Sequence, residues 1–248
     1  MKVELDLHCH TIASDGGCTI PHLALMAKEA GMDALVVTDH SGSHHSYYQN
    51  LTVLDTLQRI GHPPVLPVIV GSEIGTPYGE FLLFGSKAIK NWYRYQRRLK
   101  EVHRLFDMDA YFTAFHEYVL HSRKELPLAG GKKMDHDKLP LTNSIRVCKL
   151  PFAMFICHPE PALSEYQKWP DVLWSFLHGF EVQNDFTHYD QESPDKVEYL
   201  KSKIKKPWLL RNSDAHWDEV GRASNTFTFP DGKEITEGNL IKAIKDGP

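Results

Sequence analysis

Two histidines near the start of the chain, His8 and His10, flank a single residue in the stretch DLHCH, and Asp15 follows them. Side chains two residues apart on an extended segment point to the same side, so both imidazoles can bind one cation. The stretch NSDAH, late in the chain, repeats this spacing with Asp214 and His216. Imidazole nitrogens and carboxylate oxygens are common ligands of divalent metal ions, and these two stretches therefore indicate a metal site.

Three further ionisable residues stand at the ends of apolar segments: His40 ends VVTDH, Glu73 lies near the end of VIVGSE, and His158 follows FIC. One such histidine is equally well explained by ordinary hydrogen bonding. Five segments that each end in His, Asp or Glu are harder to explain by packing, because polar groups gathered in a core need partners. Nitrogen and oxygen ligands without thiolate favour zinc, manganese or iron in a catalytic site over a closed structural zinc site.

The number of candidate ligands, about seven or eight, exceeds what one ion needs. We therefore expect two or three divalent metal ions that share a bridging carboxylate. Such a cluster can lower the pKa of bound water and stabilise both the attacking and the leaving oxygen of a phosphoryl displacement.

Apolar segments alternate with helical ones along the chain. Apolar runs separated by helices predict an α/β fold with a parallel sheet covered by helices. The ligands would then lie at the C-terminal ends of the strands, where barrel enzymes place their active sites. The predicted strands span 3–10, 34–40, 65–76, 81–86, 152–160, 179–185 and 208–216, and the predicted helices span 19–31, 51–60, 164–178, 194–206 and 236–247.

A length of 248 residues suits one large domain, expected over 1–248 with a long loop or insertion at about 107–148. The net charge of −4 disfavours a general affinity for nucleic acid, although a local basic patch would permit it. The four cysteines form no CxxC pair, which favours a reducing compartment. The first residues contain no apolar signal region, and no apolar run approaches the roughly 20 residues that span a bilayer. We therefore expect a soluble cytoplasmic protein that contacts no membrane.

Five pieces of the sequence together resemble the PHP superfamily, named for its polymerase and histidinol phosphatase domains. They occur in the order of that family. The resemblance implies a distorted (β/α)7 TIM-like barrel, the PHP fold, with a two- or three-metal centre that hydrolyses phosphate esters. The matching pieces are DLHCHT with Asp15 downstream, VVTDHSG, GSEIGT, ICHPE and NSDAH.

The resemblance also implies three sets of metal ligands, with Glu73 as the bridge between the first and second ions. The implied ligands are His8, His10, Glu73 and Asp214 for the first ion, Glu73 and His158 for the second, and Asp15, His40 and His216 for the third.

The chain departs from the family pattern at the second ion. Many relatives carry a histidine in a stretch similar to GEFLLFG, where Glu80 stands here. His116, in AFHEYV, resembles a fragment of some members. Either residue can complete the second site, and our prediction names His116. At the third ion some members have histidine where this chain has Asp15.

The expected activity is that of a metal-dependent phosphoesterase, in which a metal-activated hydroxide attacks phosphorus in line. A small phosphomonoester is the expected substrate, and Arg222 is the expected phosphate-binding residue. Glu181, Asp39 and Asn212 are expected to support the site, the last two by orienting imidazoles. The alternatives are a nuclease that acts on DNA or RNA phosphodiesters and a metal-binding regulatory module without catalysis. The sequence leaves the oligomeric state open.

Overall fold

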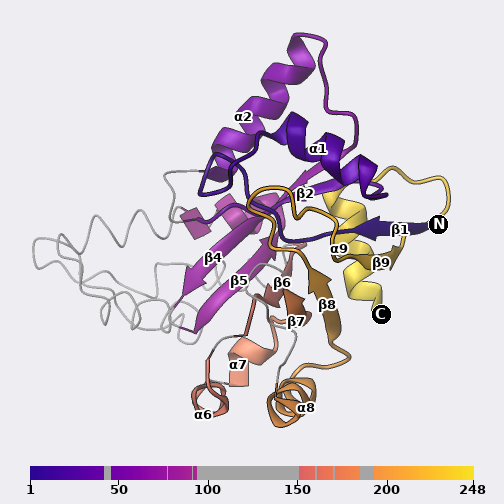
Figure 1. The fold of residues 1–248 in the computed structure, drawn as a ribbon. Helices are drawn as coiled ribbons and strands as arrows, with labels where there is room; N and C mark the ends of the chain where they lie inside the picture. The colour runs from indigo at the N-terminus through magenta and orange to yellow at the C-terminus, as the bar shows by residue number, and fades with distance from the viewer. Residues whose placement is uncertain are drawn as a thin grey trace, which may run out of the picture.

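The computed structural model shows a mixed α/β fold in which helices flank groups of short strands (Figure 1). It describes residues 1–41, 46–76, 78–90, 92–93, 151–159, 161–169, 171–184 and 193–248. The strands are β1 (Lys2–Leu5), β2 (Leu35–Val37), β3 (Val68–Val70), β4 (Ser72–Thr76), β5 (Gly79–Phe84), β6 (Ala153–Ile156), β7 (Gly179–Asn184), β8 (Trp208–Asn212) and β9 (Asn225–Thr228). The named helices are α1 (Ile20–Glu29), α2 (Ser46–Arg59), α6 (Leu163–Tyr166), α7 (Asp171–Trp174), α8 (Pro194–Lys203) and α9 (Glu237–Asp246).

The described strands form three sheets: β1 with β9, β2 with β3, and the five-stranded order β4-β5-β6-β7-β8. The expectation of a parallel sheet is only partly correct, because β1–β9, β4–β5 and β5–β6 are antiparallel. Parallel pairing holds for β2–β3, β6–β7 and β7–β8. Only residues 77 and 78 separate β4 from β5, which is too short for the crossover that parallel neighbours require.

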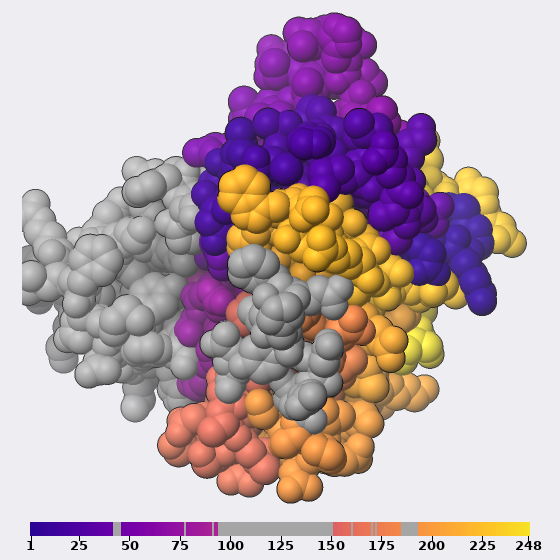
Figure 2. All heavy atoms as spheres, viewed as in Figure 1, coloured from indigo at the N-terminus to yellow at the C-terminus, as the bar shows by residue number. Residues whose placement is uncertain are grey.

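Within the described part of the chain, these sheets do not form one closed barrel, so the barrel expected from the family resemblance is not confirmed here. Isolated bridges nevertheless connect the segments beyond the strand ends, joining Cys9 to Ala215 and His40 to Glu73. In addition, the Thr38 amide donates to the Cys9 carbonyl at 2.8 Å. The segment 8–10 therefore lies between the segments around 215 and 38. Figure 2 shows the indigo N-terminal residues directly beside the orange-yellow residues of this C-terminal segment.

Clusters of buried apolar side chains join the helices to the strands, which explains where the helices lie. Aromatic side chains of α6 and α7, among them Tyr166 and Trp174, pack in one cluster with Phe81 of β5 and Phe180 of β7. The amphipathic helix α9 buries its apolar face against β9 and β6. The helix predicted over 164–178 is divided into α6 and α7, with Pro170 between them, as expected for a residue that cannot continue a helix.

Strand β9 was not predicted, because NTFT is short and mostly polar. Its alternation fits an edge strand, in which Asn225 and Phe227 are buried while Thr226 and Thr228 are exposed. No helix in the described ranges is both long enough and apolar enough to cross a membrane.

Gly179 begins β7, directly opposite Trp208 of β8. A methyl group added at Gly179 would lie 2.1 Å from the Trp208 carbonyl oxygen, which belongs to the backbone and cannot rotate away. We expect Gly179→Ala to lower the free energy of unfolding by about 1–3 kcal/mol, the usual cost of overpacking. Urea denaturation of the variant and the parent would measure this, with exposed Gly238→Ala as the control, since nothing lies within 4 Å of an added methyl there. Equal midpoints for Gly179→Ala and the parent would contradict the β7–β8 register.

Candidate metal centre

Two imidazoles and two carboxylates converge where the segment after β1 meets the segment after β8. His8 Nε2 lies 3.2 Å from Asp214 Oδ1, and His10 Nε2 lies 3.1 Å from the same oxygen. The carboxylate of Glu73 approaches from β4, with one oxygen 3.4 Å from His8 Nε2 and the other 3.4 Å from His10 Nε2. These are the four residues expected to hold the first ion, and the structure brings all of them together.

These contacts are not ordinary hydrogen bonds. His8 Nε2, His10 Nε2 and Asp214 Oδ1 are buried and have no hydrogen bond of normal geometry among the described residues. A buried polar atom without a partner is costly, and here several such atoms point at one another. A divalent cation among them would satisfy them all, and the nitrogen and oxygen donors suit zinc, manganese or iron. The residues present therefore fit a metal ion.

Glu181 of β7 fixes the orientation of His8. Its Oε1 accepts a hydrogen bond from His8 Nδ1 at 2.9 Å, so the ring presents Nε2 to the centre. The same carboxylate accepts bonds from Asn212 Nδ2 at 2.7 Å and from the backbone amide of His158 at 2.6 Å. Glu181 thus connects two of the expected ligands. Asn212 acts through Glu181 and contacts no imidazole directly among the described hydrogen bonds.

The backbone at Asp214 is unusual. Its φ of 52° lies in the left-handed region, which residues other than glycine seldom adopt. Its carbonyl accepts a hydrogen bond from His216 Nδ1 at 2.8 Å. The turn therefore aims the Asp214 carboxylate at His8 and His10 while it orients the ring of His216, and such strain is typical of functional sites.

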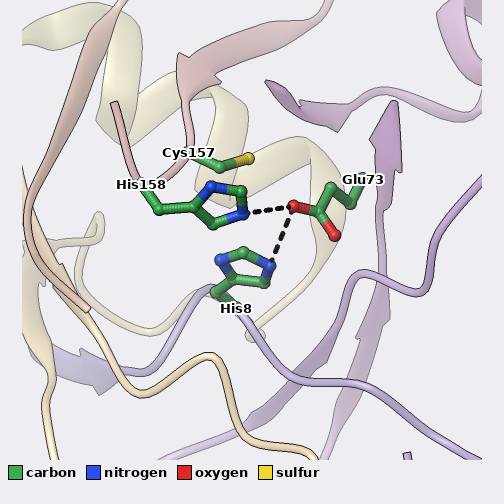
Figure 3. A group of neighbouring side chains, drawn as sticks. All are labelled: His8, Glu73, Cys157 and His158. Carbon is green, nitrogen blue, oxygen red and sulfur yellow. Dashed lines mark hydrogen bonds and ion pairs between the residues drawn. The ribbon is translucent and has the colours of Figure 1, made fainter. Parts of the chain in front are cut away.

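A second group of candidate ligands lies around Glu73 Oε1. His158 Nε2 lies 3.0 Å from Glu73 Oε1, and Figure 3 shows His158 and His8 both directed at that oxygen. Cys157 Sγ lies in the same group. Burial raises the pKa of this thiol well above its usual range.

The sequence did not decide whether His116 or Glu80 completes the second site. His116 lies outside the described residues, so its role remains a prediction. Glu80 lies at the group, with Oε2 3.4 Å from His158 Nε2.

A third group surrounds Asp15. Its carboxylate lies 3.2 Å from His40 Nε2, 3.4 Å from His216 Nε2 and 3.4 Å from His10 Nδ1. The hydrogen bond from His10 and the nearby imidazoles hold the pKa of Asp15 below its usual range. Asp15 is half exposed, so this group opens toward solvent. The three residues expected at the third ion are therefore neighbours.

Two buried aspartates hold the loops that carry these ligands. Asp6 accepts hydrogen bonds from the Ser213 amide and hydroxyl and from the Gly221 amide, which fixes the loop after β8. Burial raises the pKa of Asp6 to about 6 despite these bonds. Asp39 accepts hydrogen bonds from Thr11, and Ser14 donates to it as well, which fixes the loop after His10. Asp39 contacts no imidazole directly among the described hydrogen bonds, but Ser14, which donates to it, lies 3.4 Å from His10 Nδ1. The expected role of Asp39 in orienting an imidazole stays a prediction.

Arg222, the expected phosphate-binding residue, lies on the surface after β8 with 54% of its side chain exposed. One of its guanidinium nitrogens lies 3.4 Å from the Asp218 carboxylate. Its role in substrate binding stays a prediction.

Metal binding at this centre is expected to release protons. Burial lowers the pKa of His40 and His158, but hydrogen bonds and charges from Glu73 outweigh it and raise both pKa values to about 9. At pH 7 both rings are therefore protonated, whereas metal ligands must be neutral. The apparent metal affinity should rise with pH up to about 9 and level off above it.

Calorimetric titration with Mn²⁺ at pH 7, in two buffers of different ionisation enthalpy, measures the released protons. The observed enthalpy should differ between the buffers, and the difference should shrink above pH 9. Identical enthalpies at pH 7 would contradict the proposed protonation.

The model of the PHP domain family matches residues 6–139, more than half of the chain. The chain therefore belongs to the PHP domain family, as the motifs predicted. A protein of Caldicellulosiruptor bescii named "Probable phosphatase" is 25% identical over 237 residues, which cover 91% of this chain and 85% of the relative.

Two solved structures are also similar. One is a two-domain protein of Bacteroides vulgatus described as containing a "predicted PHP-like metal-dependent phosphoesterase", with 20% identity and a TM-score of 0.44 over 88% of this chain. This chain spans about half of that protein, 53% of its length. The other, from Bifidobacterium adolescentis, is described as a metal-dependent phosphoesterase, with 17% identity and a TM-score of 0.47 over 98% of this chain and 96% of the other.

Proposed function

We propose that this chain is a metal-dependent phosphoesterase that hydrolyses a small phosphomonoester. The observation that carries this proposal is the convergence of His8, His10 and Asp214 on one point, with Glu73 shared between that point and His158. Membership of the PHP family and the relative named as a phosphatase support hydrolysis of phosphoric esters.

The proposed ligand sets follow the three groups. The first ion is held by His8, His10, Glu73 and Asp214, the second by Glu73 and His158 with His116 as a predicted ligand, and the third by Asp15, His40 and His216. Zinc, manganese and iron all suit these donors.

A divalent ion held here supplies Lewis acidity, which activates water and stabilises charge on a phosphoryl group. The protein's own groups do the positioning. Glu181 keeps His8 turned with Nε2 toward the centre, and the Asp214 turn keeps its carboxylate opposite that nitrogen. Asp15 is half exposed, so a phosphate can approach from its side of the centre. Arg222, predicted to bind that phosphate, lies after the same strand as Asp214.

We also propose that the strands follow the distorted barrel of the family. The bridges from Cys9 to Ala215 and from His40 to Glu73 support this, since they join strand ends that belong to different sheets. The single domain over 1–248 and the cytoplasmic location remain predictions, and the expected insertion at 107–148 lies outside the described residues.

The test is hydrolysis by the protein loaded with Mn²⁺ or Zn²⁺. We expect release of p-nitrophenol from p-nitrophenyl phosphate and much slower release from the bis ester. Preference for the bis ester, with activity that falls steeply as salt is added, would instead indicate a nuclease. Failure to cleave any member of a broad phosphoester panel after metal uptake would favour a regulatory module.

A further inference from the structure

Glu80 lies beside Glu73 on the same face of the sheet. In the β4–β5 hairpin, Glu73 pairs with Leu82 and Gly75 pairs with Glu80. Residues 73 and 75 share one face of β4, so the partner of residue 75 is a diagonal neighbour of residue 73 on that face. A methyl group added at Gly75 would lie 3.7 Å from Glu80 Oε1, in ordinary van der Waals contact, so the Glu80 carboxylate lies directly over Gly75 on this face.

Strand β6 brings His158 to the same place. The Glu80 carbonyl accepts a hydrogen bond from the Cys157 amide at 3.0 Å, which fixes the end of β6 against β5. The next residue, His158, places Nε2 3.4 Å from Glu80 Oε2 and 3.0 Å from Glu73 Oε1. One imidazole nitrogen is therefore shared between two carboxylates that belong to adjacent strands.

The other oxygen of Glu80 faces His40, whose Nδ1 lies 3.9 Å from Oε1. The described ion-pair partners of Glu80 are thus two expected metal ligands, His158 and His40. Glu80 also lines a cavity of about 350 Å³ together with Tyr78, Cys157 and His158. The carboxylate therefore has space in front of it and is not packed into the core.

We infer that Glu80 is a ligand of the second metal ion, which it holds together with Glu73 and His158. This inference rests on the proposed function, because it assigns a further ligand to the same centre. Two carboxylates and an imidazole supply the oxygen and nitrogen donors that zinc and manganese bind. A cation between the two carboxylates also removes the repulsion between like charges at close range.

The experiment measures bound metal in Glu80→Gln, which keeps the shape of the side chain and removes its charge. Each protein is dialysed against Mn²⁺ at graded concentrations, and bound metal is counted by mass spectrometry. The Co²⁺-substituted proteins give a visible spectrum that reports coordination. We expect Glu80→Gln to lose one ion, or to bind it at least about tenfold more weakly, with a changed Co²⁺ spectrum. Circular dichroism confirms that each variant is folded.

Two variants serve as controls. Glu165→Gln removes an exposed carboxylate of α6 that pairs with Lys168, and it should bind metal as the parent does. His116→Ala tests the other predicted ligand of this ion. Metal binding by Glu80→Gln that equals Glu165→Gln, or loss of the second ion in His116→Ala alone, would overturn the role of Glu80. The proposed function would then survive, provided that the parent binds metal and cleaves phosphate esters. A parent protein that binds no metal would overturn both.

Discussion

Replacing His8 with alanine is expected to lower kcat for phosphate ester hydrolysis by about a thousandfold or more in the metal-loaded protein. His8 Nε2 faces both Asp214 and Glu73, so its loss removes one nitrogen ligand from the proposed first ion, next to these two carboxylates. Lewis-acid stabilisation by a metal ion contributes several kcal/mol to the transition state, and about 4 kcal/mol corresponds to a factor of a thousand.

The matched control is His22→Ala, because His22 is an exposed histidine of α1 outside the three ligand groups. Both variants are loaded with the same metal and assayed with p-nitrophenyl phosphate, after circular dichroism has shown equal folding. His22→Ala should keep the parent rate. If His8→Ala hydrolysed the ester as fast as His22→Ala, the assignment of the first site would be incorrect.

Metal loading is expected to raise the melting temperature of the protein strongly. The native fold holds unpaired buried atoms on His8, His10 and Asp214 that an ion would satisfy, whereas the unfolded chain offers no assembled site. Binding to the native state alone, at a free metal concentration about a thousand times the Kd, adds about 4 kcal/mol. For a chain of this size each kcal/mol shifts the melting temperature by about 2–4 °C, so we expect an increase of about 10 °C.

Differential scanning calorimetry of the chelator-treated and the Mn²⁺-loaded protein at pH 8 measures this shift. The increase should become smaller at pH 6, because the raised pKa values of His40 and His158, about 9, make protons stronger competitors of the metal as pH falls. Asp214→Asn should show a reduced shift at either pH. An unchanged melting temperature on metal addition to the parent would mean that the centre does not bind the ion in the folded state.

The motifs, together with their resemblance to the PHP family, named most of the side chains that the structure brings together. His8 and His10 flank a residue that is bridged to Ala215, so alternation along an extended segment places both rings on one side. The family resemblance grouped Asp15, His40 and His216, and the structure places these three side chains together. Such local patterns can be predicted from the sequence, because the side to which a side chain points depends on the backbone geometry of its own segment.

The pairing of the strands could not be predicted from local sequence patterns. The antiparallel direction of β5 and the presence of β9 depend on which segments meet in space, and local periodicity does not encode that. For the same reason the sequence left Glu80 as one of two candidates for the second site, because its closeness to His158 requires the register of β4, β5 and β6 at once. The hydrogen bonds from Ser213 and Gly221 to Asp6 were not predicted either, since a buried aspartate that holds a distant loop leaves no spacing signal for those contacts.

The most direct measurement is anomalous X-ray diffraction from crystals grown with Mn²⁺ or Zn²⁺. We expect a strong anomalous peak about 2.0–2.2 Å from His8 Nε2, His10 Nε2 and an oxygen of Asp214, with Glu73 between that peak and a second peak beside His158. A metal-soaked crystal with these side chains apart, or with no peak between them, would contradict it.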